Sequence, residues 1–156
     1  MADLVGQGIG SLRDLLKFLT DRSRSADVLK NGLLRELRDN LQLLQHRNAA
    51  GANRQAIIQS LKTDAIDAAF KGNFKFHTLS SGKKVGAQHI VADRQNRYTG
   101  WDEKRLITSM EGKIHELRQL GNIFPDQESA GINIPARLDN LYFQILLLST
   151  FIYSGK

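Results

Sequence analysis

The residues best suited to chemistry form a basic segment, residues 71–101, that also carries aromatic side chains. It holds six basic residues and one acidic residue, Asp93, and so carries +5 of the formal net charge of +6. Lysine and arginine neutralise phosphates, and flat side chains stack on unpaired bases, so a nucleic-acid surface needs both close together. We therefore predict that this segment contacts nucleic acid or another polyanion. The residues predicted to do so are Lys75, Lys83, Lys84, Arg94, Arg97, Tyr98 and Trp101.

The basic segment also allows two other interpretations. In the first, Phe74 and Phe76 anchor it to the rest of the fold, and its lysines serve only solubility. In the second, its partner is an acidic protein instead of a nucleic acid. Composition alone does not choose among these alternatives, because a basic patch attracts any acidic surface.

The common signatures of nucleotide binding and of nucleophilic catalysis are missing from the sequence. Gly6, Gly8 and Gly10 suggest a phosphate loop, but only five residues precede them, too few for the buried strand that such a loop follows. No Lys-Ser or Lys-Thr pair follows these glycines. No serine lies in a Gly-x-Ser-x-Gly motif, so a nucleophile elbow has no support.

Metal chemistry has no support from the spacing of ligands either. The chain has no cysteine, and its four histidines form no His-Glu-x-x-His or His-x-His motif. His77 and His89 could face each other across a hairpin, which would supply only two ligands. Asp64 and Asp67 share a helix face and are interpreted as solvated charges. We predict neither a metal nor a cofactor. The four histidines are His46, His77, His89 and His115.

A catalytic alternative rests on Arg38 and His46. In size and helical content the chain resembles ribonucleases of the HEPN type, small helical bundles common in bacterial toxin and defence systems. Those enzymes use an Arg and a His separated by four to six residues, whereas seven separate Arg38 from His46. On one helix this spacing leaves the side chains about 80° and about 12 Å apart. The resemblance therefore implies metal-independent RNA cleavage only across a dimer.

Helical patterns flank the basic segment and must position it. Leu34, Leu37, Leu41 and Leu44 alternate spacings of three and four, which predicts a helix that packs against others in a bundle. Similar apolar spacing recurs four more times, and polar residues such as Ser11, Ser25 and Asn53 precede helices as N-caps. The predicted helices span approximately residues 11–20, 26–46, 53–72, 99–121 and 135–153.

The predicted fold class is mainly α, an antiparallel bundle of about five helices. Residues 74–79 begin with alternating apolar and polar side chains, which predicts a strand, and residues 85–91 would return as a second strand. This gives a small basic β-hairpin insertion over residues 72–98, between the third and fourth helices. Residues 1–156 are expected to form one domain, with residues 1–10 as a loose tip.

Composition predicts a cytoplasmic protein that does not enter a membrane. The lack of cysteine suits a reducing compartment, and no secretion signal is recognisable at Met1. The most apolar stretch, residues 138–153, is interrupted by polar side chains and is predicted to be a core helix. The leucine-rich helices are compatible with a homodimer. They also suggest a third function, a structural adaptor that pairs with helices of a partner protein.

Overall fold

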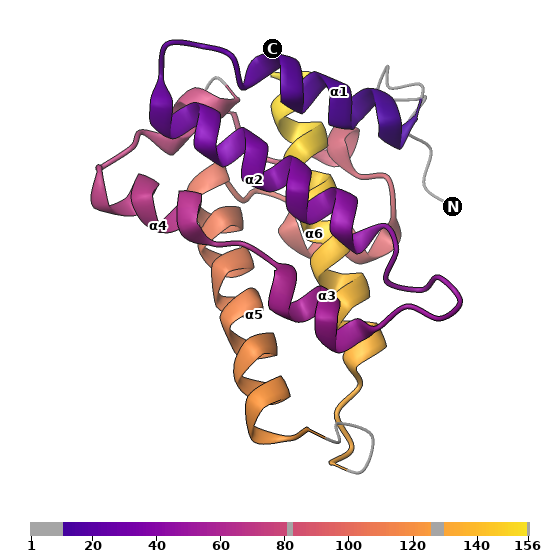
Figure 1. Cartoon of the computed structure of the whole chain (residues 1–156). Helices are drawn as coiled ribbons and strands as arrows, with labels where there is room; N and C mark the ends of the chain where they lie inside the picture. Colours follow the sequence, from indigo (N-terminus) through magenta and orange to yellow (C-terminus); the bar gives the residue numbers. More distant parts are fainter. Residues whose placement is uncertain (1–10, 81–82, 126–129, 156) are drawn as a thin grey trace.

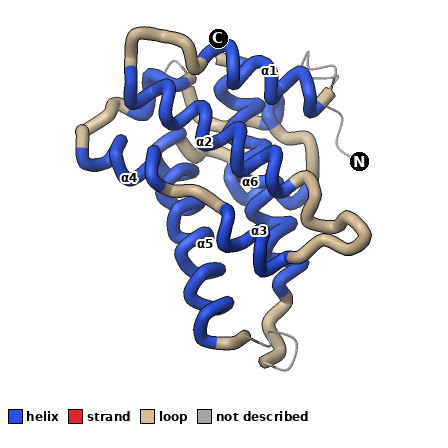
Figure 2. Tube along the Cα trace, viewed as in Figure 1, coloured by secondary structure: helices blue, strands red, loops and turns tan. Residues whose placement is uncertain are grey.

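The computed structural model describes residues 11–80, 83–125 and 130–155, and in these ranges helices are joined by loops and turns, with no β-strand (Figures 1 and 2). The predicted tip at residues 1–10 lies outside them. The α-helices are α1 (Leu12–Arg22), α2 (Val28–Leu44), α3 (Arg54–Ser60), α4 (Asp64–Lys71), α5 (Glu103–Ile123) and α6 (Ile134–Ser154). Three 3₁₀-helices lie between α4 and α5: η2 (Phe76–Leu79), η3 (Ala87–His89) and η4 (Asp93–Tyr98). The mainly helical bundle predicted from the sequence is confirmed.

Helix α6 is the centre of the core. It contacts α1, α2 and α5 as well as η3 and η4, and α2 crosses in front of it in Figure 1. Its apolar residues lie on most sides of the helix, as the sequence indicated, and even the polar residues Gln144, Ser149 and Thr150 are buried. The Ser149 and Thr150 hydroxyls donate to backbone carbonyls of the same helix, so their burial leaves no donor unpaired. Within the described residues, no helix has both the length and the apolar character needed to cross a membrane.

Short polar side chains begin most of the helices. In five of them the N-cap side chain accepts a hydrogen bond from the backbone N–H three residues later, the usual N-cap arrangement. The predicted caps Ser11 and Asn53 are confirmed. The prediction of Ser25 is wrong, because Asp27 caps α2. Ser25 lies in the turn before the helix and donates to the side chain of Asn31 in α2.

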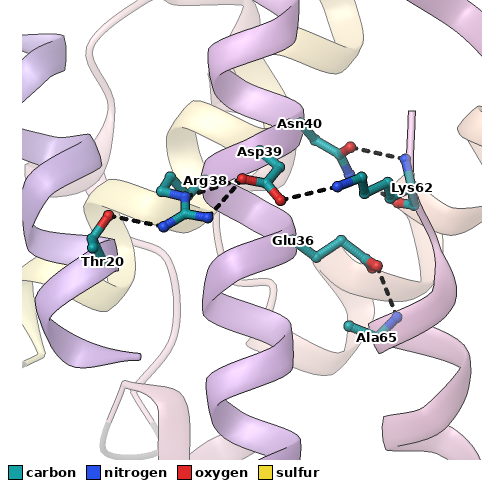
Figure 3. Close-up of polar contacts among 7 residues, drawn as sticks. All are labelled: Thr20, Glu36, Arg38, Asp39, Asn40, Lys62 and Ala65. Atoms are coloured by element: carbon teal, nitrogen blue, oxygen red, sulfur yellow. Dashed lines mark hydrogen bonds and ion pairs between the residues drawn. The ribbon is translucent and has the colours of Figure 1, made fainter. Parts of the chain in front are cut away.

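The single helix predicted over residues 53–72 is divided into α3 and α4. Between them the backbone of Leu61 is extended, and two polar side chains of α2 satisfy the groups that the break exposes (Figure 3). Asn40 accepts from the Lys62 N–H and donates to the Lys62 carbonyl, both at 2.9 Å. Glu36 accepts from the N–H groups of Ala65 and Ile66, at 2.7 and 3.1 Å. Glu36 thus caps α4 from the neighbouring helix α2. The N-cap residue of α4 itself, Thr63, makes no capping hydrogen bond with its side chain.

The predicted β-hairpin is wrong for the part of residues 72–98 that the structure describes, since it contains only 3₁₀ turns and loops. The buried residues explain why. Phe76 and Leu79 lie three apart, as do Gln95 and Tyr98, and a 3₁₀-helix has three residues per turn, so each pair shares one face. These faces pack on α5 and α6. Two isolated strands would have gained less, because a lone hairpin is marginally stable.

Candidate functional site

The five predicted basic residues of the segment are all exposed, but they do not form one group. Lys75 lies at the start of η2, Lys83 and Lys84 in the loop before η3, and Arg94 and Arg97 on η4. The two predicted aromatic residues differ in exposure. Trp101 is partly exposed, whereas Tyr98 is buried and cannot offer a ring face to a ligand.

Trp101 lines a shallow hollow of about 470 Å³ at the beginning of α5. The guanidinium of Arg105 lies over the indole, with its central carbon 4.0 Å from the ring centroid. This cation–π contact holds an exposed cation in a fixed place, beside Lys104 and the hydroxyl-bearing residues Thr108 and Ser109. The hollow therefore combines an aromatic ring, two cations and two hydroxyl groups.

A second hollow of about 230 Å³ adjoins the first, because Asp102 and Lys104 line both. Its other walls include Phe74, Lys75 and His77, from the segment that leads into η2. The lining of the two hollows thus combines cations, aromatic rings and the carboxylate of Asp102. We define the basic surface as the cations of the two hollows, the indole beside them and the two lysines of the neighbouring loop: Lys75, Lys83, Lys84, Trp101, Lys104 and Arg105.

Backbone hydrogen bonds bring the lysine loop to Trp101. The Val85 N–H donates to the Trp101 carbonyl at 2.9 Å, and the Gly100 N–H donates to the Val85 carbonyl at 2.7 Å. Lys84, which precedes Val85, therefore lies close to Gly100 and Trp101 along the backbone. Gly100 has a positive φ of 86°, a conformation that glycine adopts without strain and that permits this close return of the chain.

Two acidic residues lie beside the basic surface, and one of them is buried. Glu103 is completely buried and accepts a 2.5 Å hydrogen bond from the Ser80 hydroxyl. Asp102 is exposed and lines both hollows, and as the N-cap of α5 its side chain accepts from the Arg105 N–H at 2.9 Å. The exposed cations Lys75, Lys104 and Arg105 outnumber this one exposed carboxylate, so the lining of the two hollows is positive overall.

Two of the predicted residues have contacts within the fold instead. The Arg94 guanidinium lies 4.8 Å from the ring centroid of Phe143 and is hydrogen-bonded to Asn140, both on α6. The Tyr98 hydroxyl accepts from the Lys113 ammonium at 2.7 Å, and its ring meets that of Trp101 edge to face. Tyr98 thereby supports Trp101 from behind. Lys104 and Arg105 were not predicted, since they lie just beyond the basic segment in the sequence.

Arg38 and His46 are not brought together within one copy of the chain. The Arg38 guanidinium is bound to Asp39 at 2.9 Å and to the Thr20 hydroxyl at 3.2 Å, facing α1 (Figure 3). His46 lies beyond the end of α2, is exposed, and has its imidazole beside the amide of Gln45. No described contact points to a shared role of these two residues.

The histidine pair suggested for a hairpin has a different environment from the one expected. His89 is buried with its ring edge-on to Phe151, and its Nδ1 accepts from the Gly86 N–H at 2.9 Å. Burial lowers the pKa of His89, and the charge of Lys83 lowers it further. His77 is exposed on η2, in the wall of the second hollow. His89 is therefore a neutral core residue.

A group of possible metal ligands lies elsewhere, between α4 and α5. Asp67 of α4 and Glu111 and His115 of α5 place one ligand atom each within 4.8 Å of one another. Burial raises the pKa of Glu111, and the adjacent Asp67 carboxylate raises it further. Burial likewise raises the pKa of Glu36, which faces Asp64 and Asp67. We refer to Asp67, Glu111 and His115 as the carboxylate–histidine cluster.

This cluster was missed in the sequence, where Asp67 was interpreted as a solvated charge and no metal was predicted. The available signal was the spacing of Glu111 and His115, four residues apart and so on one face of a helix. Nothing in the sequence connects that pair to Asp67, which lies 44 residues earlier.

Comparison with known proteins adds no relative from which a function could be transferred. No family model matches the chain, and neither the curated proteins nor the solved structures give a match. Function must therefore be argued from the geometry of the surface and the cluster.

Proposed function

We propose that this chain is a non-enzymatic binding module whose basic surface contacts single-stranded nucleic acid. The observation that carries the proposal is the pair of adjoining hollows, which Trp101 and Phe74 line together with Lys75, Lys104 and Arg105. Single strands are bound by surfaces that combine the two kinds of side chain, since cations follow the phosphates while unpaired bases stack on flat side chains.

The arrangement of Arg105 supports the proposal further. Its guanidinium already lies over the indole of Trp101, so less side-chain freedom remains to be lost when a phosphate binds. The same guanidinium offers a planar face on which a base can stack. An acidic protein or another polyanion would use the cations but would gain less from the aromatic walls.

The direct test measures binding of labelled single-stranded RNA, single-stranded DNA and duplex DNA by fluorescence anisotropy at two salt concentrations. If about four cations contact phosphates of a single strand, affinity should fall about 50-fold between 50 and 200 mM salt, since the logarithmic slope is about −0.7 per contact. Heparin serves as a polyanion without bases. If heparin and single strands bind equally well, the ligand of the basic surface would be any polyanion and not nucleic acid in particular.

The matched variants change charge equally at two places. Reversal of Lys83, Lys84, Lys104 and Arg105 to Glu should abolish binding. Reversal of Arg13, Lys17, Arg24 and Arg35, which are exposed on α1, α2 and the turn between them, should leave most of it. If both variants lose affinity equally, binding follows net charge, and if neither does, the basic surface is not the site.

The same assay addresses the two alternative functions. RNA that becomes shorter without added metal, and remains intact with His46→Ala, would support the ribonuclease. A chain that binds no nucleic acid but forms a stoichiometric complex with a helical partner would support the adaptor. No contact among the described residues favours either alternative over the binding module.

A further inference from the structure

Among the described residues, the two carboxylates of the carboxylate–histidine cluster form no ion pair. One ligand atom each of Asp67, Glu111 and His115 lie within 4.8 Å of one another, so the two carboxylates are close neighbours. Two ionised carboxylates cannot hydrogen-bond to each other, because neither carries a donor. The Glu111 Oε2 atom is shielded from solvent and has no hydrogen-bond partner. A cation between the two side chains would give this oxygen the partner that it lacks.

Three basic residues close to the cluster in sequence have other partners. Lys62 pairs with Asp39 at 3.2 Å, Lys113 with Tyr98 and Gln144, and Arg118 with the Leu61 carbonyl. Among the described residues, no Lys or Arg forms an ion pair with either carboxylate of the cluster. Glu36 of α2 adds negative charge beside Glu111.

The geometry suits a metal ion. Ligand atoms that each lie 2.0–2.2 Å from one ion are at most about 4.4 Å apart, and the three ligand atoms here lie within 4.8 Å of one another. Small side-chain rotations would close the difference. Glu111 and His115 lie on successive turns of α5, and Glu36 fixes the start of α4, which carries Asp67. All three ligands therefore come from rigid elements.

We propose that Asp67, Glu111 and His115 bind one divalent transition-metal ion of the Zn²⁺ or Mn²⁺ class. The imidazole favours these ions over Mg²⁺ and Ca²⁺, which prefer oxygen ligands alone, and the two carboxylates balance the charge of the ion. Because His115 is exposed, solvent can reach the site and supply the remaining ligands. The site is independent of the basic surface, and it reverses the prediction made from the sequence.

The metal would have a structural consequence. Helix α4 packs mainly on α2, whereas the cluster joins it to α5. An ion held by both helices would fasten α4 to a second partner, and any ligand that binds only the folded state stabilises it. Metal addition should therefore raise the melting temperature.

The test titrates the chelator-treated, full-length chain with ZnCl₂, MnCl₂ and MgCl₂ by calorimetry and follows the melting temperature in parallel. We expect one equivalent of Zn²⁺ or Mn²⁺ to bind at micromolar concentration and raise the melting temperature, with Mg²⁺ binding at least about 10-fold more weakly. His115→Ala and Glu111→Gln should each weaken binding at least about 10-fold. Glu111→Gln preserves the side-chain shape, so it should fold without metal.

The matched control is the double variant His46→Ala and His77→Ala, which removes two exposed histidines outside the cluster and should bind as wild type does. The proposal is overturned if neither Zn²⁺ nor Mn²⁺ binds below millimolar concentration. It is equally overturned if binding persists unchanged in Glu111→Gln and His115→Ala.

Discussion

The two charged regions of this molecule handle their charges in opposite ways. At the basic surface the exposed cations outnumber the one exposed carboxylate, Asp102, while Glu103 is buried within the fold. In the carboxylate–histidine cluster the acidic groups lie close together, while Lys62 and Lys113 have other partners. One region presents its charge to a partner outside the molecule, and the other is suited to an ion within it.

Glu36 is a buried carboxylate that has donors, unlike the Glu111 oxygen of the cluster, and it allows the largest test of what such donors contribute. Glu36 accepts from two backbone N–H groups of α4, so Glu36→Ala should leave both unpaired and lower the free energy of unfolding by roughly 3 kcal/mol. Urea denaturation of the variant measures the change. A loss below about 0.5 kcal/mol would mean that water replaces the carboxylate.

Trp101 tests whether the basic surface is more than a set of charges. If a base stacks at this indole or its bound guanidinium, Trp101→Ala should weaken single-strand binding about 10-fold, the lower part of the range measured for stacking residues. Heparin binding should change much less. Phe143→Ala is the control, since that ring holds Arg94 away from the hollows. Equal losses for both ligands would indicate a purely electrostatic surface.

Glu111 gives the smallest expected effect and the one most sensitive to pH. Its folded-state pKa lies above the ordinary value of 4.5, so its contribution to stability is complete below pH 4.5 and is lost as pH rises through the folded-state pKa. Without metal, Glu111→Gln should remove this loss and stabilise the chain at neutral pH by less than about 1 kcal/mol. Thermal unfolding of both proteins between pH 4 and 8, with chelator, measures the difference. A steeper decline in the variant would contradict the assignment.

Local patterns predicted the helices well and their interruptions poorly. The leucine spacing of α2 and the caps Ser11 and Asn53 are properties of neighbouring residues, so they could be read directly from the sequence. The break between α3 and α4 could not, because Asn40 and Glu36 make it from another helix. The hairpin prediction failed for the same reason, since packing against α5 and α6 decided the conformation of the segment.

The sequence by itself determined the helical class, the five exposed cations of the basic segment and the central place of α6, because charge, apolar periodicity and turn chemistry act over a few residues. Only the tertiary structure added Lys104 and Arg105 to the surface of Trp101, took Tyr98 into the core, and brought Asp67 to Glu111 and His115. Those relations join residues that are distant in the chain, or they depend on which way a side chain points after packing. They exist only after the helices have packed, since side-chain burial and charge pairing depend on every element in contact.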